Sequence, residues 1–349
     1  MIRKAAVAAA LMGAWLWSPS PARSQHAPAN LKIERLDPRF DALIPPDAAV
    51  ERVANGIVWS EGPLWDPVDQ SLLFSDVPRN GVYRWKEGVG VTQVIAGSGY
   101  TGRGLFTGRE PGSNGLVFDR QGRLVRCQHG NRRIVRREVD GSETVLADRY
   151  QGRRLNSPND LVYAPNGDLY FTDPPFGLPG TFNDPAKELP FQGVYRLSRD
   201  GVLSAVITDL KAPNGLGFSP DGKLLYVSSS DRERPTWFVY PVRDDGTVGP
   251  GRVFAEATAW VGPGEGVADG LKLDEQGNVF AAGPGGIHVF APDGTRLGRI
   301  ETAAPTGNLN WGEDGSVLFI AANHSILRLR TTTRGFIAPG RDESAARRR

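Results

Sequence analysis

Hydrophobic positions along this chain occur in short runs separated by polar, glycine-rich turns, and this combination recurs six times. Five of the units read as strand, turn, strand, and their turns hold Gln-Gly, Asn-Gly or Asp-Gly pairs that supply the positive φ of a tight hairpin. The remaining unit, SEGPLWDPVDQSLLFSD, has the same shape without the turn glycine. The units begin at Ser60, Ser113, Pro158, Pro213, Ala268 and Thr306.

The repeat predicts an all-β fold in which each unit belongs to one blade. Successive units start at intervals in the forties and fifties of residues, with a shorter last interval, which suits a four-stranded blade with variable outer loops. No amphipathic helix of useful length separates the strands, which disfavours a parallel α/β fold. A solenoid stays open, but six units in one domain favour a closed ring. We predict a six-bladed β-propeller over residues 31–335, closed by a strand from within Leu31 to Val58.

The two ends of the sequence carry different signals. Residues 1–24 begin with Arg3 and Lys4, continue with an apolar run and end in small residues, as a cleaved signal peptide does. A membrane anchor is the alternative, but the run is shorter than the roughly 20 residues that span a bilayer. We expect a secreted, periplasmic protein with no membrane span after cleavage. Residues 336–349 are arginine-rich and are expected to form a disordered tail.

Composition narrows the classes of function. The 349 residues are 40% hydrophobic, enough for one sizeable core, and 41 basic against 39 acidic residues give a net charge of +2. Apart from the arginine-rich tail, no feature of the sequence suggests binding to a polyanion, so we expect no nucleic-acid partner. Cys127 is the only cysteine, which precludes an internal disulfide, and its strand-like surroundings indicate a small buried hydrophobe rather than a nucleophile.

Aligning the six units on their turns places polar side chains in one column. The column stands at the start of the first strand of each hairpin, where an innermost blade strand lines the channel of a propeller. Its members are Glu61, Asn114, Asn159, Asn214 and Asp269, with Gly307 in the last unit. We therefore expect five oxygen-bearing side chains to converge on one axis.

Two carboxylates with several amide oxygens form a set of hard donors. Such a set suits Ca²⁺, Mg²⁺ or Mn²⁺ better than a metal that prefers sulfur or imidazole. The other interpretation is that Asn and Asp precede strands because they form turns. Because Glu61 is not a turn-forming residue and falls in the same column, we favour one divalent cation: calcium first, with magnesium, manganese or zinc as alternatives.

Other motifs are weaker. GSGYTG at 97–102 formally matches a dinucleotide-binding pattern, but no helix opens there. The sequence holds no GxSxG nucleophile elbow and no HExxH zinc pattern. His129 is either a substrate-side residue of the second unit or a structural histidine. Asp173, in YFTDPPFG, is either a strand-end cap or an acid of the pocket, and we favour the pocket because the Pro/Gly-rich segment up to Gln192 is suited to form a lid.

Several of these motifs together carry a family resemblance. With SEGPLW, RLNSPNDLV, YFTDPPFG, PNGLGFSPD and ADGLKLD, the chain resembles the gluconolactonase/regucalcin (senescence marker protein) family, especially its bacterial branch, from about Val53 to Leu329. The resemblance implies a six-bladed propeller that hydrolyses aldonolactones. It also implies roles for particular residues: metal ligands at Glu61, Asn214 and Asp269, a general base at Asp269, a substrate-side residue close to the metal at Asn159, and substrate contacts at Asn114 and Asp173.

The chain departs from this family at one place. Vertebrate members carry an arginine two positions before the third-blade asparagine, where this chain has Ser157. Arg153 or Arg154 is a potential substitute, although neither stands at the same position. The preferred sugar is therefore left open.

The predicted function is metal-dependent hydrolysis of a sugar lactone such as glucono-1,5-lactone. The cation would polarise the lactone carbonyl, and Asp269 would activate the attacking water. Whether the cation also binds that water is open. The alternatives are a related propeller hydrolase acting on another lactone or an organophosphate, and a non-catalytic propeller whose cation only holds the blades together.

Overall fold

Short antiparallel strands account for most of residues 27–336, the part of the chain that the computed structural model describes. The predicted signal peptide at 1–24 lies outside the described residues, as does the predicted tail beyond residue 336, and both stay predictions. No helix among the described residues is long and apolar enough to cross a membrane. The helical elements in this part of the chain are short 3₁₀ segments: η1 (Pro38–Ala42), η2 (Thr181–Asn183) and η3 (Thr258–Trp260).

Within residues 27–336, all strands except one short two-stranded ribbon belong to six sheets, each running from the channel outwards. Blade 1 contains β4 (Ser60–Asp66), β5 (Ser71–Asp76), β6 (Gly81–Lys86) and β7 (Gly90–Ala96). Blade 2 contains β8 (Ser113–Phe118), β9 (Leu124–Gln128), β10 (Arg133–Arg137) and β11 (Glu143–Ala147), and a small ribbon of β12 (Arg149–Tyr150) and β13 (Arg153–Arg154) follows it. Blade 3 contains β14 (Leu161–Tyr163), β15 (Leu169–Asp173), β16 (Gly193–Leu197) and β17 (Leu203–Ile207).

The second half of the ring repeats this order. Blade 4 contains β18 (Pro213–Phe218), β19 (Leu224–Ser229), β20 (Thr236–Pro241) and β21 (Arg252–Glu256). Blade 5 contains β22 (Leu271–Leu273), β23 (Val279–Gly283), β24 (Gly286–Phe290) and β25 (Arg296–Glu301), with β2 (Ile33–Arg35) added at its edge. Blade 6 contains β26 (Asn308–Gly312), β27 (Val317–Ala322), β28 (Ser325–Arg330), β3 (Glu51–Asn55) and β1 (Ala27–Pro28).

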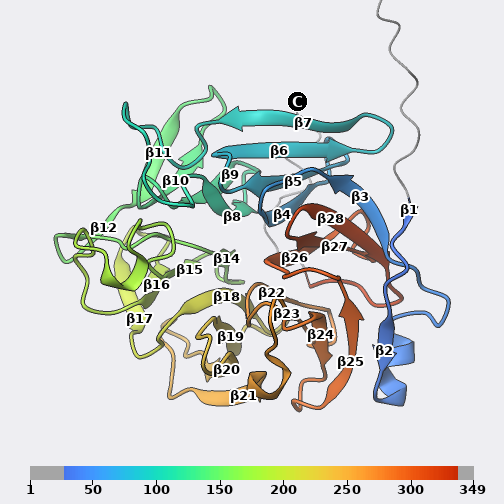
Figure 1. Ribbon diagram of the computed structural model, residues 1–349. Helices are drawn as coiled ribbons and strands as arrows, with labels where there is room; N and C mark the ends of the chain where they lie inside the picture. Colours follow the sequence, from blue (N-terminus) through green and yellow to red (C-terminus); the bar gives the residue numbers. More distant parts are fainter. Residues whose placement is uncertain (1–26, 337–349) are drawn as a thin grey trace, which may run out of the picture.

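The innermost strands form a closed ring. Each contacts the next in the order β4, β8, β14, β18, β22, β26 and back to β4, and these strands surround the centre of the molecule (Figure 1). The predicted all-β, six-bladed propeller is thereby confirmed. All six predicted hairpins are present as well, and in the one without a turn glycine Gln70 adopts the left-handed conformation, with φ of 49°.

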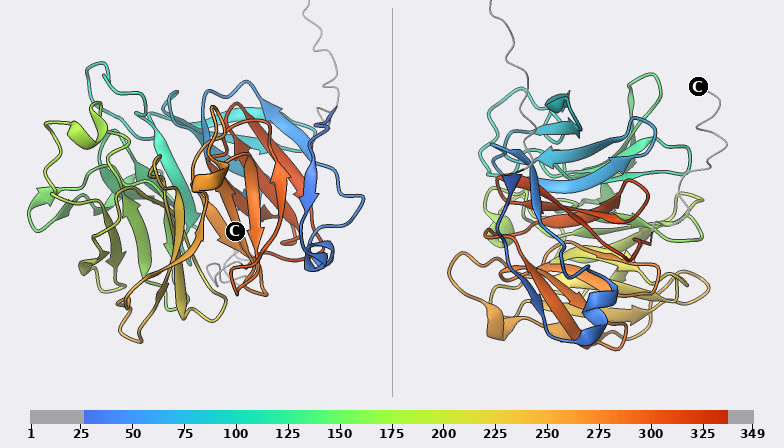
Figure 2. Two further views of the ribbon diagram at one scale, coloured as in Figure 1. Left: turned by 60° about the horizontal axis from the view of Figure 1, so that its bottom comes forward. Right: turned by 90° about the vertical axis from the view of Figure 1, so that its right-hand side faces the viewer.

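The N-terminal segment closes the ring, as predicted. β3 pairs antiparallel with β28, so the last blade takes its fourth strand from the start of the propeller. β2 pairs with β25 and η1 packs against the same strand, which covers the outer edge of blade 5 (Figure 2). Both additions cover sheet edges that would otherwise expose unpaired backbone groups.

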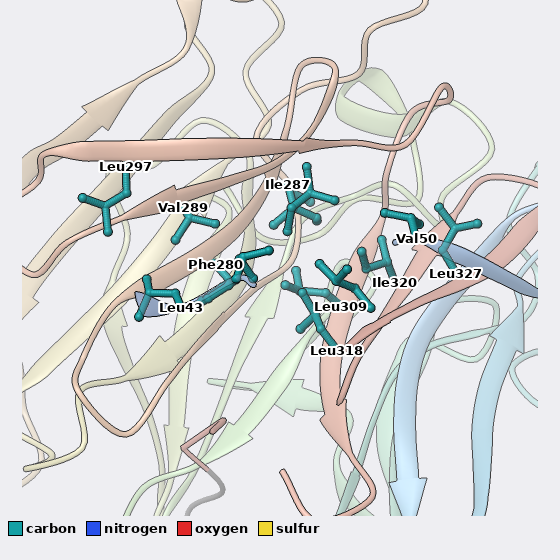
Figure 3. Close-up of a cluster of buried hydrophobic side chains, with 14 of the residues drawn as sticks. Leu43, Val50, Phe280, Ile287, Val289, Leu297, Leu309, Leu318, Ile320 and Leu327 are labelled. Carbon is teal, nitrogen blue, oxygen red and sulfur yellow. The ribbon is translucent and has the colours of Figure 1, made fainter. Parts of the chain in front are cut away.

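The hydrophobic core lies between the blades. Each pair of adjacent blades buries its own cluster of apolar side chains, and the largest such cluster among the described residues lies between blades 5 and 6 (Figure 3). Leu43 and Val50 of the N-terminal segment join Phe280, Leu309 and Leu318 there. Burial of each such side chain contributes about 1.5–3 kcal/mol. Because the segment that closes the ring also contributes side chains to this cluster, closing the ring adds to the stability of the fold.

Candidate active site

The polar column predicted from the repeat converges on one cavity. Five side chains of the column line a cavity of about 360 Å³ at one mouth of the channel: Glu61, Asn114, Asn159, Asn214 and Asp269. They come from five different blades, and Glu61 is only 3% exposed. The cavity also has walls that the repeat did not predict, formed by Trp59, Glu110, Phe176, Ser230, Arg232 and the loop segments 261–267 and 305–306.

A repeated bulge places the column at this mouth. The β8–β9 and β18–β19 ladders shift register so that Asn114 and Gly115 together oppose Cys127, and Asn214 and Gly215 together oppose Ser228. The β4–β5 ladder shifts just after Glu61. An extra residue of this kind re-aims a side chain at the end of a strand. At the rim of the channel, the side chain of the column residue therefore does not follow the alternation of side chains between the two faces of the sheet.

Glycines beside the column allow the blades to approach one another. A Cβ on Gly62 would lie 2.3 Å from the carbonyl oxygen of Asn114, and one on Gly215 would lie 2.5 Å from the carbonyl oxygen of Asp269. Gly307, the sixth member of the column, has a different neighbour: a Cβ there would lie 2.4 Å from Oε1 of Glu61. The missing side chain in the last unit therefore provides the space that the Glu61 carboxylate occupies.

Hydrogen bonds orient the column amides. Nδ2 of Asn214 donates to Oγ of Ser230 at 2.9 Å, and Nδ2 of Asn159 lies 3.5 Å from Nε2 of His129. With its amide nitrogen engaged on the protein side, each asparagine has its Oδ1 free for the cavity. Oδ1 of Asn114 is buried and has no hydrogen-bond partner. Because Asn114 lines the cavity, this oxygen is a candidate contact for a ligand.

Negative charge is concentrated at the cavity. Burial, together with the charges of Asp160 and Glu110, raises the pKa of Glu61 to about 8. The pKa of Asp269 is raised well above its ordinary value, chiefly by burial and then by the charges of Glu61, Asp160 and Glu110. Carboxylates this close together repel one another, so a positive charge placed among them would be strongly favoured.

The donors therefore fit a hard divalent cation. No group of three or more His, Cys, Asp and Glu side chains suited to a metal occurs within residues 27–336. The candidate set instead combines the carboxylates of Glu61 and Asp269 with amide oxygens, which is the ligand chemistry that Ca²⁺ and Mg²⁺ prefer.

A polar cluster next to Glu61 was not predicted. Asn308 of blade 6 donates from Nδ2 to Oδ2 of Asp160 in blade 3 at 3.3 Å, and Nζ of Lys272 lies 3.6 Å from the same oxygen. Asp160 and Asn308 each directly follow a residue of the column. Inspection of the next position in the aligned units would therefore have identified both. Four of the six residues that follow the column are glycines, so these two side chains can meet across the axis.

Two predicted substrate-side residues do not line the cavity. His129 is fully buried behind Asn159, and its Nδ1 lies 3.0 Å from Oε2 of Glu110. Asp173 is also fully buried, where its Oδ2 accepts a hydrogen bond from the backbone N–H of Asn156 at 2.7 Å, and burial raises its pKa to about 7. Neither residue lines the cavity, and substrate contact by His129 or Asp173 stays a prediction.

Two further expectations concern the segment after Asp173 and the arginine that this chain lacks at position 157. The segment after Asp173 does reach the mouth, because Phe176 lines the cavity. Ser157, where the resemblance implies an arginine, is buried and binds this segment: its Oγ donates to the carbonyl oxygen of Pro174 at 2.6 Å and accepts from the N–H of Gly177 at 2.8 Å. Neither Arg153 nor Arg154 lines the cavity, whereas Arg232 of blade 4 does.

Known proteins resemble this chain over most of its length. Residues 59–324 match the family described as SMP-30/Gluconolactonase/LRE-like region. A gluconolactonase of Zymomonas mobilis is 41% identical over 312 residues, 87% of each chain, and a pentonolactonase, XacC, of Haloferax volcanii is 27% identical over 249 residues, 69% of this chain and 72% of that protein. The solved structure of a gluconolactonase from Xanthomonas campestris is 32% identical, with a TM-score of 0.76 over 88% of this chain and 97% of that one. The match of fold and of sequence shows that the chain belongs to the SMP-30/gluconolactonase/LRE-like family.

Proposed function

We propose that this protein hydrolyses a sugar lactone of the glucono-1,5-lactone type, with a divalent cation held at the mouth of the propeller channel. The observation that carries the proposal is the convergence of five oxygen-bearing side chains from five blades on one cavity. Lactone hydrolysis itself is supported by family membership and by the gluconolactonase that is 41% identical over most of both chains.

The cation would be held by Glu61, Asn214 and Asp269, with Asn159 as a fourth ligand. These residues line the same cavity and supply carboxylate and amide oxygens. When bound, a divalent cation supplies positive charge that keeps the two carboxylates ionised and stabilises the negative charge developing on the lactone carbonyl oxygen. We expect calcium first, because large flexible sets of oxygen ligands suit it best.

Asp269 would take the proton from the attacking water. The water oxygen bonds to the carbonyl carbon, the ring C–O bond breaks, and the proton held by Asp269 becomes available to the alcohol that is released. Nδ2 of Asn214 is bound to Ser230, which holds the amide beside Asp269 in one orientation. The carboxylate is therefore positioned before the substrate arrives.

The substrate hydroxyls would be held by the remaining polar wall. Oδ1 of Asn114 has no partner within the protein, and Arg232 offers guanidinium donors at the rim of the same cavity. Trp59 and Phe176 provide apolar surface on which a sugar ring packs. Export to the periplasm is part of the proposal, and it rests on the signal-peptide pattern of residues 1–24 alone.

The proposal is tested by removing and restoring the cation. Protein stripped of metal is assayed by pH-stat on glucono-1,5-lactone, with spontaneous hydrolysis subtracted, after adding Ca²⁺, Mg²⁺, Mn²⁺ or Zn²⁺ in turn. Glu61→Gln removes one ligand charge at nearly constant size, and Glu275→Gln, an exposed carboxylate in the turn after β22, is the matched control.

Activity that a cation restores in the wild type and in Glu275→Gln, but not in Glu61→Gln, is the expected result. Activity without any cation would contradict metal dependence. If no cation restores activity on this lactone, the same panel is applied to other lactones and to organophosphates. A protein inactive on all of them would be a ligand-binding propeller.

A further inference from the structure

A second cavity adjoins the cavity lined by the polar column, which is here called the reaction cavity, at the same mouth of the channel. It has a volume of about 650 Å³, larger than the 360 Å³ of the reaction cavity. The two share four wall residues: Glu110, Phe176, Ser230 and Arg232. The segment after Asp173, here called the lid segment, and the loop after β19 both contribute to its lining. Because the two cavities share wall residues, the reaction cavity opens onto the second cavity.

One wall of the second cavity is aromatic and apolar. Phe176 and Phe182 of the lid pack edge to face, with ring centroids 6.1 Å apart, and Leu178 and Pro179 lie between them in the sequence. Phe182 is 39% exposed, so its ring is accessible from this cavity. The electron-rich faces of aromatic rings are suited to the C–H face of a pyranose.

The rest of the lining is polar and electrically balanced. Nζ of Lys211 binds Oδ1 of Asp231 at 2.9 Å and Oε2 of Glu233 at 3.0 Å. Arg109 and Arg232 face the same space, so with Glu110 the lining holds three basic and three acidic side chains. A balanced set of donors and acceptors suits a neutral polyhydroxyl group better than a phosphate or another strong anion.

We propose that this second cavity binds a further sugar ring, so that the substrate class includes aldonolactones that carry a glycosidically linked sugar. The inference rests on the proposed function and extends it from single-ring lactones to disaccharide lactones. A cavity lined by both aromatic and polar side chains suits a sugar ring, because a pyranose has an apolar face and a rim of hydroxyls. The shared residues Phe176, Ser230 and Arg232 place the two rings side by side.

Substitution of Phe182 tests the second cavity without changing the lining of the reaction cavity. It lines the second cavity but not the reaction cavity, whereas Phe176 lines both. Because Phe182 is partly exposed, its truncation to alanine leaves the blades intact. Val253→Ala, on outer strand β21 with 42% exposure, is a matched truncation of a partly exposed apolar side chain.

The experiment compares kcat/KM on glucono-1,5-lactone, cellobiono-1,5-lactone and maltobiono-1,5-lactone, using the full chain with the cation that supports activity. We expect the wild type to hydrolyse at least one disaccharide lactone as efficiently as the single-ring lactone. Phe182→Ala should lower kcat/KM on that disaccharide lactone about tenfold, as the loss of one aromatic contact predicts, and should change the single-ring value less than twofold. Val253→Ala should change neither.

Two results would overturn the inference while leaving the proposed function intact. One is efficient hydrolysis of glucono-1,5-lactone with kcat/KM values for both disaccharide lactones more than tenfold lower. The other is a Phe182→Ala variant that loses equal activity on one ring and on two, since that would make the residue structural. A wild type inactive on all three lactones would instead refute the proposed function, and the subsite with it.

Discussion

Replacing Gly307 with alanine should damage the site while leaving the fold intact. The added Cβ would lie 2.4 Å from Oε1 of Glu61, whereas ordinary van der Waals contact begins at 3.4 Å. The carboxylate must therefore retreat by about 1 Å, and misplacing a positioned group by that distance costs up to about 100-fold in rate. The carbonyl oxygen of Ser60, at 3.1 Å from the added Cβ, requires a smaller adjustment.

The same change should have little effect on stability. Gly307 does not have a left-handed φ, so alanine fits its backbone conformation. A compatible Gly→Ala change gains about 0.4–1 kcal/mol from the unfolded chain, which offsets part of the cost of moving the Glu61 side chain. We therefore expect kcat/KM to fall about 100-fold and the thermal midpoint to change by less than about 4 °C.

The assay is pH-stat hydrolysis of glucono-1,5-lactone, combined with calorimetric titration of the activating cation and a thermal melt. Gly104→Ala is the control, because the nearest atom to its added Cβ is Oη of Tyr100 at 4.0 Å. If Gly307→Ala keeps wild-type kcat/KM and wild-type cation affinity, the space beside Glu61 has no functional role and the reasoning is refuted. A variant that unfolds would show that the added Cβ clashes with the backbone of the blade and not only with the Glu61 side chain.

Three further predictions concern buried groups. Asp269→Asn should lower kcat by on the order of 10²–10⁴, and near-full activity with the cation still bound in calorimetry would exclude the proton-accepting role. Because burial raises the pKa of Asp173 to about 7 from 3.8, the folded protein holds a proton that the unfolded chain releases, so this group's contribution to stability is present in acid and is lost as the pH rises through about 7. Thermal melts from about pH 5 to 8 should show a smaller decline in Asp173→Asn than in the wild type, and equal slopes would contradict the assignment. Cys127 is buried with a raised pKa, so its thiol should react with an aromatic disulfide reagent only after unfolding; fast reaction in the native protein would show that blade 2 opens.

The blades and the shared position of the polar column could be predicted from the sequence, because both depend on local chemistry that recurs. Gly167 and Gly222 have the positive φ that the hairpin turns require, and each turn fixes the pairing of the two strands beside it. Once the units are aligned on these turns, the column containing Asn159 and Asn214 follows. Equivalent positions in equivalent blades face the same axis.

The surroundings of that column could not be read from the repeat, because they depend on contacts between blades. Asp160 pairs with Asn308, 148 positions away in the sequence. Gly307 of blade 6 leaves space for Glu61 of the adjacent blade 1. His129 and Asp173 carry side chains that suit a pocket, yet both lie behind its wall. Such outcomes depend on how far each bulge turns a side chain and how closely two blades approach, and both are set by packing between segments that are distant in the chain.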